Sequence, residues 1–257
     1  VYRMSDERIL LRSYLKSLKL PTIQREYQPT ARACSQENTS YESYLQRLAE
    51  MEVQHRQAQA TARRLKQANF PMPKELSNFD FQSVPQINKK QIIDLSMCEF
   101  IDKRNNVVFT GPPGVGKSHL AIALGTEACR RGYNVKFFTA AALVNTYIEA
   151  RHEKAILRLE GHIKRNDLII VDELGYVPFD RIGAEHLFGF FSQCYELTSL
   201  IVTTNLPFAE WPQVFGDDDR LAGALLDRLT HHVHVIEIIS KSWRLNSSME
   251  EQKKKVE

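Results

Sequence analysis

Eight residues, Gly111 to Ser118, constrain the fold of this chain more than any other stretch, and they read Gly-Pro-Pro-Gly-Val-Gly-Lys-Ser. The apolar run Val107 to Phe109 before them predicts a strand, and the stretch His119 to Arg131 after them predicts a helix. Glycines let the backbone curl between these elements so that successive N–H groups point inward, which is the arrangement that holds phosphate oxygens. A strand, such a loop and a helix in this order predict a nucleotide site rather than a glycine-rich turn without function.

The residue types in this loop suit a triphosphate. Lys117 brings a positive charge to the β and γ phosphates, and Ser118 offers a hydroxyl to Mg²⁺. The predicted nucleotide-binding residues are Gly111, Pro112, Pro113, Gly114, Val115, Gly116, Lys117, Ser118 and His119.

Apolar runs alternate with amphipathic stretches beyond residue 70, which is the pattern of a parallel sheet flanked by helices. Strands are predicted at 106–109, 135–139, 168–172, 200–204 and 233–238. Helices are predicted at 117–131, 140–150, 153–165, 184–197 and 220–230. The predicted fold class is therefore α/β.

Polar side chains end two of the predicted strands. Asp172 and Glu173 follow Leu-Ile-Ile-Val, and Asn205 follows Leu-Ile-Val-Thr-Thr. The carboxyl ends of parallel strands meet at the edge where the phosphate loop also emerges. There Asp172 can hold Mg²⁺ through its waters, Glu173 can orient or deprotonate an attacking water, and Asn205 can hydrogen-bond the γ-phosphate or that water. Taken alone, such residues after a strand are also typical of turns and helix caps.

The first 70 residues predict a separate helical domain. Apolar residues recur at helical spacing from Ile9 to Leu18, a second helix is predicted at 22–33, and Thr39 and Glu42 have the spacing of a capping box that opens a long helix. The prolines in the stretch 70–73 cannot continue that helix, which divides the chain into domains 1–70 and 71–257. The first domain holds 12 of the 34 Lys+Arg residues but 7 of the 31 Asp+Glu residues, an excess that suits nucleic acid or a solvated basic face.

Composition bounds the cellular setting. Hydrophobic residues make up 43% and charged residues 25% of the chain, as in ordinary soluble proteins, and no apolar run approaches the roughly 20 residues that span a bilayer. We therefore expect a cytoplasmic protein without a membrane partner. The four cysteines lie far apart and indicate neither a zinc site nor a disulfide framework. The histidines at 231, 232 and 234 have no evident carboxylate or cysteine partner, which disfavours a metal site there.

Together the motifs resemble those of AAA+ ATPases: Gly111 to Ser118 resembles Walker A, Asp172-Glu173 resembles Walker B, and Thr204-Asn205 resembles sensor 1. More specifically, residues 172–188, 203–211 and 214–232 resemble the IstB-like ATP-binding helpers of insertion-sequence transposition, which are similar to the helicase loader DnaC and the initiator DnaA. The resemblance implies ATP and Mg²⁺ as cofactors. It also implies an ASCE sheet, in which the sensor 1 strand lies between the two Walker strands.

The resemblance assigns roles to two arginines. Arg228, in Leu-Leu-Asp-Arg, matches the arginine finger that reaches the γ-phosphate of a neighbouring subunit, and Arg220 is a nearby competitor. A fixed guanidinium there would stabilise the charge that develops during phosphoryl transfer. Arg244 matches the sensor 2 arginine, although the family usually has Gly-Glu-Ser-Tyr-Arg where this chain has Ser-Lys-Ser-Trp-Arg. The resemblance thus implies a homo-oligomer with ATP sites between subunits.

The function implied is an ATPase that assembles on duplex DNA and stimulates or targets a transposase of the IstA type. Initiator-type relatives carry a DNA-facing helical insertion between the second and third strands. The basic residues of that stretch are Lys136, Arg151, Lys154, Arg158, Lys164 and Arg165. A second candidate set for DNA is Arg56, Arg63 and Arg64. The alternative is a helicase loader that grips another ATPase through residues 1–70. A metabolic P-loop kinase is disfavoured, because no lid-like arginine cluster can be picked out.

Overall fold

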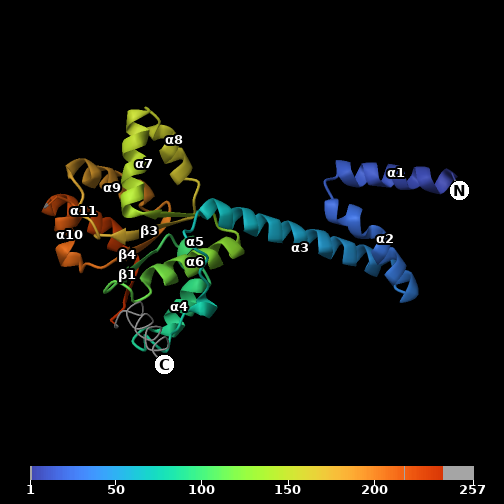
Figure 1. Ribbon diagram of the computed structural model, residues 1–257, viewed down its shortest axis with the longest axis horizontal. Coiled ribbons are helices and arrows are strands. Elements are labelled where there is room, and N and C mark those ends of the chain that lie inside the picture. The colour runs from blue at the N-terminus through green and yellow to red at the C-terminus, as the bar shows by residue number, and fades with distance from the viewer. Residues whose placement is uncertain (1, 217, 240–257) are drawn as a thin grey trace, which may run out of the picture. The chain divides into compact units, whose positions relative to one another are not determined.

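The core of the fold is a five-stranded sheet in the order β2-β3-β4-β1-β5, in which every pair of neighbours is parallel. The computed structural model describes residues 2–216 and 218–239 (Figure 1). The strands are β1 Asn106–Thr110, β2 Val135–Thr139, β3 Leu168–Leu174, β4 Ser199–Thr204 and β5 Val233–Glu237. Because β4 lies between β1 and β3, the predicted position of the sensor 1 strand between the two Walker strands is confirmed.

Helices precede, connect and follow the strands, and the predicted α/β class is confirmed. In chain order they are α1 Tyr2–Ser17, α2 Pro21–Gln36, α3 Tyr41–Ala68, the 3₁₀ turn η1 Leu76–Asn78, α4 Lys89–Ser96, α5 Glu99–Asp102, α6 Lys117–Arg131, α7 Ala140–His152, α8 Ile156–Ile163, α9 Arg181–Cys194, the 3₁₀ turn η2 Phe208–Glu210, α10 Trp211–Val214 and α11 Asp219–Thr230. Helices α4, α5 and α10 were not predicted, because elements this short carry too few turns for a helical period to show. None of the helices in the described residues is both long and apolar enough to cross a membrane.

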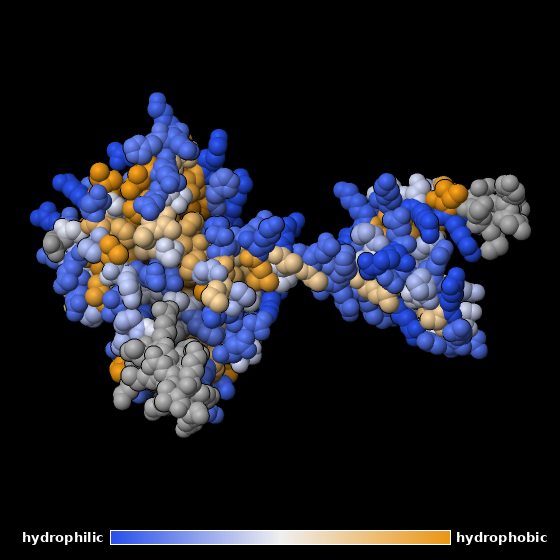
Figure 2. Space-filling model, viewed as in Figure 1, coloured by the Kyte–Doolittle hydropathy of each residue, from blue (hydrophilic) through white to orange (hydrophobic). Residues whose placement is uncertain are grey.

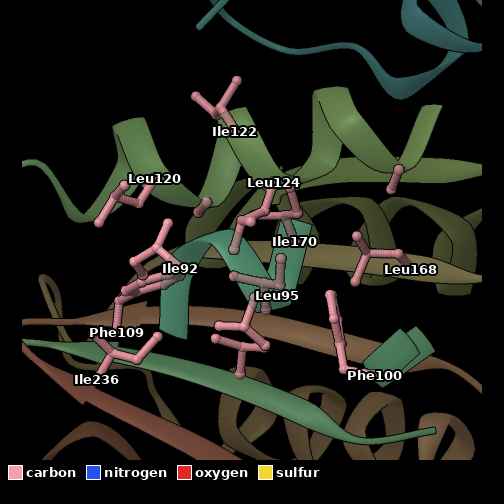
Figure 3. Close-up of a cluster of buried hydrophobic side chains, with 14 of the residues drawn as sticks. Ile92, Leu95, Phe100, Phe109, Leu120, Ile122, Leu124, Leu168, Ile170 and Ile236 are labelled. Carbon is pink, nitrogen blue, oxygen red and sulfur yellow. The ribbon is translucent and has the colours of Figure 1, made fainter. Parts of the chain in front are cut away.

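Side chains of each strand alternate between two buried faces of the sheet. On one face, Phe109 of β1 and Ile170 of β3 pack with Leu124 of α6 and Ile92 of α4 (Figure 3). On the other face, residues such as Val108 pack with α7, α9, α10 and α11. Helices on both faces explain why the strands read as continuous apolar runs. Each Leu, Ile or Phe buried in these layers contributes roughly 1.5–3 kcal/mol to the stability of the fold. The buried layers therefore stabilise the sheet and the loops at its edge.

The chain divides into two compact units, residues 1–63 and 64–257. The second unit begins inside α3, because the last turn of that helix belongs to the core of the sheet. Ala68 is fully buried in that core, and Leu65 packs against it. The boundary that the prolines predict, after residue 70, falls a few residues beyond this division.

A buried carboxylate holds the helices of the first unit together. Glu52 of α3 accepts hydrogen bonds from the backbone N–H groups of Thr22 (2.8 Å) and Ile23 (3.1 Å), in the first turn of α2. The side chain of Leu20 cannot cap α2, so Glu52 supplies the acceptor that this helix terminus lacks. Arg56 pairs with Glu52 (Nε to Oε1, 3.0 Å) and also donates to the carbonyl of Lys19. Arg56, one of the residues predicted above to contact DNA, therefore has its hydrogen-bond partners within its own unit.

The first unit buries few of its apolar side chains. Leu15 and Leu48 are buried, whereas Ile9 and Leu18 of α1 are each 66% exposed and Leu45 of α3 is 64% exposed. Apolar patches among hydrophilic side chains are visible on both units in Figure 2. The long helix α3 begins at Tyr41, and its cap is Ser40, whose Oγ accepts from the N–H of Ser43 at 3.2 Å. The cap therefore lies one residue after the predicted Thr39.

Candidate nucleotide site

The phosphate loop joins strand β1, which lies between β4 and β5, to α6, and glycine is required at the bends of the loop. Gly111, Gly114 and Gly116 have φ angles of 141°, 82° and 98°, which residues with side chains rarely adopt. A Cβ on Gly111 would lie 2.2 Å from the carbonyl oxygen of Ile238, and one on Gly116 would lie 2.7 Å from the ring of Phe79. The predicted curl is therefore the observed one. The prolines at 112 and 113 are exposed, and the valine at 115 is buried and anchors the loop to the core.

Lys117 lies inside the loop. Its side chain is largely buried, and its Nζ donates to the carbonyls of Gly111 and Pro112, at 2.7 Å each. Lys117 is also the first residue of α6, whose opening N–H groups have no partners within the helix. An ammonium group and a helix N-terminus at one loop form a site for an anion such as a phosphate.

Residues 75–81 cover the start of α6, an arrangement that the sequence did not suggest. The ring of Phe79 lies against Gly116 and meets the ring of His119 edge-on, with 5.3 Å between centroids. The Nε2 of His119 also lies 3.0 Å from the carbonyl oxygen of Glu75. His119 is therefore held beside the loop by a segment that precedes the sheet.

Three side chains from separate segments meet at the carboxyl edge of the sheet. The hydroxyl of Ser118 donates to Oδ1 of Asp172 at 2.8 Å, and the hydroxyl of Thr203 donates to the same oxygen. Asp172 is 5% exposed and Thr203 is 1% exposed. The structure thus joins the two predicted Mg²⁺ ligands and adds Thr203, which was not predicted. The sequence held no signal for this contact, because it depends on the register of the sheet, in which Val171 pairs with Val202 and the next residues are Asp172 and Thr203.

Glu173 sits at a distortion of β3. The strand register shifts between Val171 and Leu174, and Glu173 has a φ of 62°. Its N–H donates to the hydroxyl of Thr203 at 3.0 Å, and its side chain is exposed. The distortion separates two consecutive carboxylates, because Asp172 is buried against Ser118 whereas Glu173 reaches solvent.

Asn205 follows β4 at the same edge and is half-buried. Its Oδ1 is buried, and within the described residues it has no hydrogen-bond partner. A buried amide oxygen without a partner is uncommon in native structures and is a mark of a ligand or water position.

The predicted arginines are not gathered at the loop. Arg228 of α11 donates from Nη1 to the carbonyl of Ala224 at 2.7 Å, and its guanidinium lies 5.0 Å from the ring centroid of Phe188 in α9. These contacts place Arg228 in the helical layer α9–α11 of its own chain. Arg220, at the start of the same helix, is exposed. Arg244 lies outside the described residues.

Five of the six basic residues predicted to contact DNA lie at the end of α7, in α8 and in the turns that follow them (Figure 1). All five are exposed, and they are Arg151, Lys154, Arg158, Lys164 and Arg165. The acidic Glu160 of α8 is turned inward and accepts a hydrogen bond from Gln193 of α9 at 2.6 Å. The sixth, Lys136 of β2, lies apart from this group, because its Nζ donates to the carbonyl of Gln67 at 3.2 Å.

The oxygen atoms behind the loop suit Mg²⁺. The hydroxyl of Ser118 and the carboxylate of Asp172 are the hard oxygen donors that this ion prefers. Within the residues that the structure describes, no group of three or more His, Cys, Asp or Glu side chains is placed to hold a metal ion by itself. The protein therefore offers only part of a coordination shell, which fits an ion that keeps several waters and binds together with substrate phosphates.

A parallel sheet of this order, with a phosphate loop after β1 and two consecutive carboxylate residues near the end of β3, defines the P-loop AAA+ class of fold. Solved structures agree. The replication initiator DnaA bound to AMPPCP and single-stranded DNA matches with a TM-score of 0.54 and 24% identity, over 66% of this chain and 51% of that chain, about half of its length. The DnaC helicase loader matches with a TM-score of 0.51 and 20% identity, over 68% of this chain and 98% of that chain. At these identities the likeness concerns the fold alone.

Residues 13–251 match the family model described as IstB-like ATP binding protein, and the chain belongs to that family. It is 36% identical over 246 residues to a protein of insertion sequence IS5376 from Geobacillus stearothermophilus, covering 95% of this chain and 98% of that relative. It is also 36% identical over 231 residues to a protein of insertion sequence IS21 from Pseudomonas aeruginosa, covering 90% and 87%. Both relatives are named as ATP-binding proteins, and the family resemblance found in the sequence is confirmed.

Proposed function

We propose that this chain binds and hydrolyses ATP, assembles on duplex DNA in its ATP-bound state, and there stimulates or targets a transposase of the IstA type. The observation that carries the proposal is the meeting of Ser118 and Asp172 behind the phosphate loop, in a chain of the IstB-like family. The names of the relatives, both from insertion sequences, support the transposition setting.

Several residues of one chain have separate roles in the proposed ATP hydrolysis. Lys117 would bind the β and γ phosphates, and Ser118 and Asp172 would hold Mg²⁺, which would neutralise charge on the phosphate oxygens. Glu173, exposed next to Asp172, orients or deprotonates the attacking water. The buried Oδ1 of Asn205 accepts a hydrogen bond from that water.

Arg228 completes the site of a neighbouring copy. Within its own chain the guanidinium contacts Ala224 and Phe188, so assembly would have to redirect it toward the phosphate loop of a second copy. An arginine finger supplied in this way is worth about 10³–10⁵ in rate. Because one copy then hydrolyses slowly alone, ATP binding and self-assembly are thermodynamically linked. ATP favours the oligomer on DNA, and hydrolysis loosens it.

Duplex DNA is bound by the exposed basic residues around α8. Lysine and arginine side chains bind mostly to phosphates, so they position the protein without reading sequence, and their binding weakens steeply with salt. Replacing Arg158 and Lys164 with Gln should weaken binding to all duplexes and reduce the salt slope by about one for each phosphate that is no longer neutralised. Little change in affinity across a salt titration of the unaltered protein would contradict the DNA part of the proposal.

The test of the whole proposal is assembly on linear DNA followed by electron microscopy and analytical ultracentrifugation. With ATP, the unaltered protein should form multi-subunit assemblies on duplex DNA and stimulate a transposase of the IstA type. Lys117→Ala should abolish both, whereas Lys103→Ala, which alters an exposed lysine paired with Glu99, should not. A protein that stays monomeric with ATP and duplex DNA would contradict the proposal. Assembly on single strands in preference to duplexes would favour the helicase-loader alternative.

A further inference from the structure

The hydroxyl of Thr203 joins the two carboxylate residues of the site through two hydrogen bonds. It donates to Oδ1 of Asp172 and accepts from the N–H of Glu173 at 3.0 Å. A threonine hydroxyl has a single proton, so donation to Asp172 uses all of its donor capacity and fixes its orientation. Thr203 comes from β4, a different strand from the carboxylates, and it is 1% exposed.

The backbone of Glu173 needs this support. Glu173 has a φ of 62°, in the left-handed region that is unfavourable for a residue with a side chain. The register shift in β3 also takes the N–H of Glu173 out of the regular ladder with β4, and Thr203 provides its acceptor. Thr203 thereby stabilises the distortion that buries Asp172 and exposes Glu173.

The carboxylate of Asp172 is held from two sides, by Ser118 and by Thr203. Ser118 is itself a residue that would bind Mg²⁺ through a lone pair of its hydroxyl oxygen, so its position would depend on the occupied nucleotide site. Thr203 has no such second task in the proposed site. It can keep Asp172 in one orientation whether or not nucleotide is bound.

We propose that Thr203 is a positioning residue of the ATPase site, which fixes the Asp172 carboxylate for Mg²⁺ and the Glu173 backbone for the attacking water. Asn205 lies two residues further along the same segment. This inference rests on the proposed ATPase function. Outer-shell partners of this kind change metal affinity or activity by about 10–100-fold when they are removed.

A buried threonine at the other end of the strand provides a matched control. Thr198, directly before β4, is 4% exposed, and its hydroxyl donates to the carbonyl of Asn166 at 3.3 Å rather than to either carboxylate residue of the site. Thr203→Val and Thr198→Val therefore remove the same chemical group from two buried positions at opposite ends of β4. Thr203→Ser keeps the hydroxyl and tests whether it is the group that acts.

The experiment measures the affinity for a fluorescent ATP analogue at increasing Mg²⁺ concentrations, together with kcat and KM for ATP. Thr203→Val should leave affinity without Mg²⁺ nearly unchanged, raise the Mg²⁺ concentration at half-saturation by about 10–100-fold, and lower kcat more than it changes KM. Thr203→Ser should restore most of both quantities, and Thr198→Val should match the unaltered protein.

Equal Mg²⁺ dependence in Thr203→Val and Thr198→Val would overturn the proposal, and so would a Thr203→Ser variant that behaves like Thr203→Val. If Thr203→Val does not fold, Thr203→Ala removes the same hydroxyl and replaces it in the comparison. If neither folds, the hydroxyl serves the fold and the proposal is overturned. Failure of the proposed function is distinguishable, because the unaltered protein would then show no Mg²⁺-dependent binding of the analogue.

Discussion

Glu52 in the first unit and Asp172 in the second are both almost fully buried carboxylates, at 3% and 5% exposure, yet their partners differ. Glu52 accepts from two backbone N–H groups at the positive end of a helix and pairs with Arg56. Asp172 accepts from two hydroxyls, those of Ser118 and Thr203.

The difference in partners indicates a different role for each carboxylate. A buried charge is costly unless it is paired, and Glu52 meets its compensating charge inside its own unit, so it serves the fold. Neutral hydroxyls orient the charge of Asp172 without cancelling it, which leaves that charge available for a cation. A substitution that removes the charge should therefore affect stability at one position and chemistry at the other.

The largest effect is expected for Asp172→Asn. The amide oxygen still accepts from Ser118 and Thr203, so the melting temperature should hold or rise. Loss of the metal-holding charge removes several kcal/mol of transition-state stabilisation, which corresponds to about a thousandfold fall in kcat. Steady-state ATPase assays and a thermal melt on one preparation measure both quantities. A large fall in melting temperature with kcat preserved would mean that the charge of Asp172 serves stability rather than chemistry, which contradicts the comparison.

The converse change, Glu52→Gln, should affect stability. Loss of charge-assisted hydrogen bonds at this buried position lowers the free energy of unfolding of the first unit by about 1.5–3 kcal/mol. Affinity for ATP should stay within about twofold, since the phosphate loop belongs to the second unit. Urea titration followed by circular dichroism measures the stability, and Glu50→Gln, an exposed position on the same helix, is the control. Equal free energies of unfolding in Glu52→Gln and Glu50→Gln would show that Glu52 does not stabilise the fold.

The first unit should also lose stability in acid. Burial alone would raise the pKa of Glu52, but hydrogen bonds from Ile23, Arg56 and Thr22 outweigh it and bring the pKa below its ordinary value of 4.5. Because the folded pKa is depressed, this contribution is fully present above pH 4.5 and is lost as pH falls through the lower folded pKa. Thermal melts at pH values above and below 4.5 should show that the melting temperature falls more steeply with acid for the unaltered protein than for Glu52→Gln. Parallel pH profiles would contradict this assignment.

The smallest effect concerns the buried free thiols, which report on each unit separately. Burial raises the pKa of Cys129 to about 11 and that of Cys194 to about 12, so both should resist thiol reagents in the native second unit. Cys34 lies in the first unit and becomes reactive when that unit opens. Pulsed labelling read by mass spectrometry should show faster modification of Cys34 in Glu52→Gln and no change at Cys129. Faster labelling of all cysteines would mean that the two units do not open independently.

Much of the fold could be predicted because burial on both faces of the sheet leaves a strong local signal. The strand at 135–139 and the helix at 117–131 have the predicted bounds. The meeting of Ser118 with Asp172 also followed from a general rule, since parallel strands bring their carboxyl ends to one edge. Thr203 and Glu52 could not be found in this way. Their roles depend on which side chains face each other after packing, and neither residue type is distinctive in a strand or a helix.

The central claim is that a triphosphate bound at Gly111 to Ser118 of one copy is completed by Arg228 of another. Mixing two inactive variants tests it most directly. Glu173→Gln keeps its arginine but lacks the residue proposed to activate water, and Arg228→Ala keeps its phosphate loop but lacks the finger. Each should hydrolyse ATP slowly by itself on duplex DNA, and the mixture should recover activity at the interfaces where an intact loop meets an intact Arg228. A mixture as inactive as its components, or an Arg228→Ala variant that is fully active alone, would contradict the account.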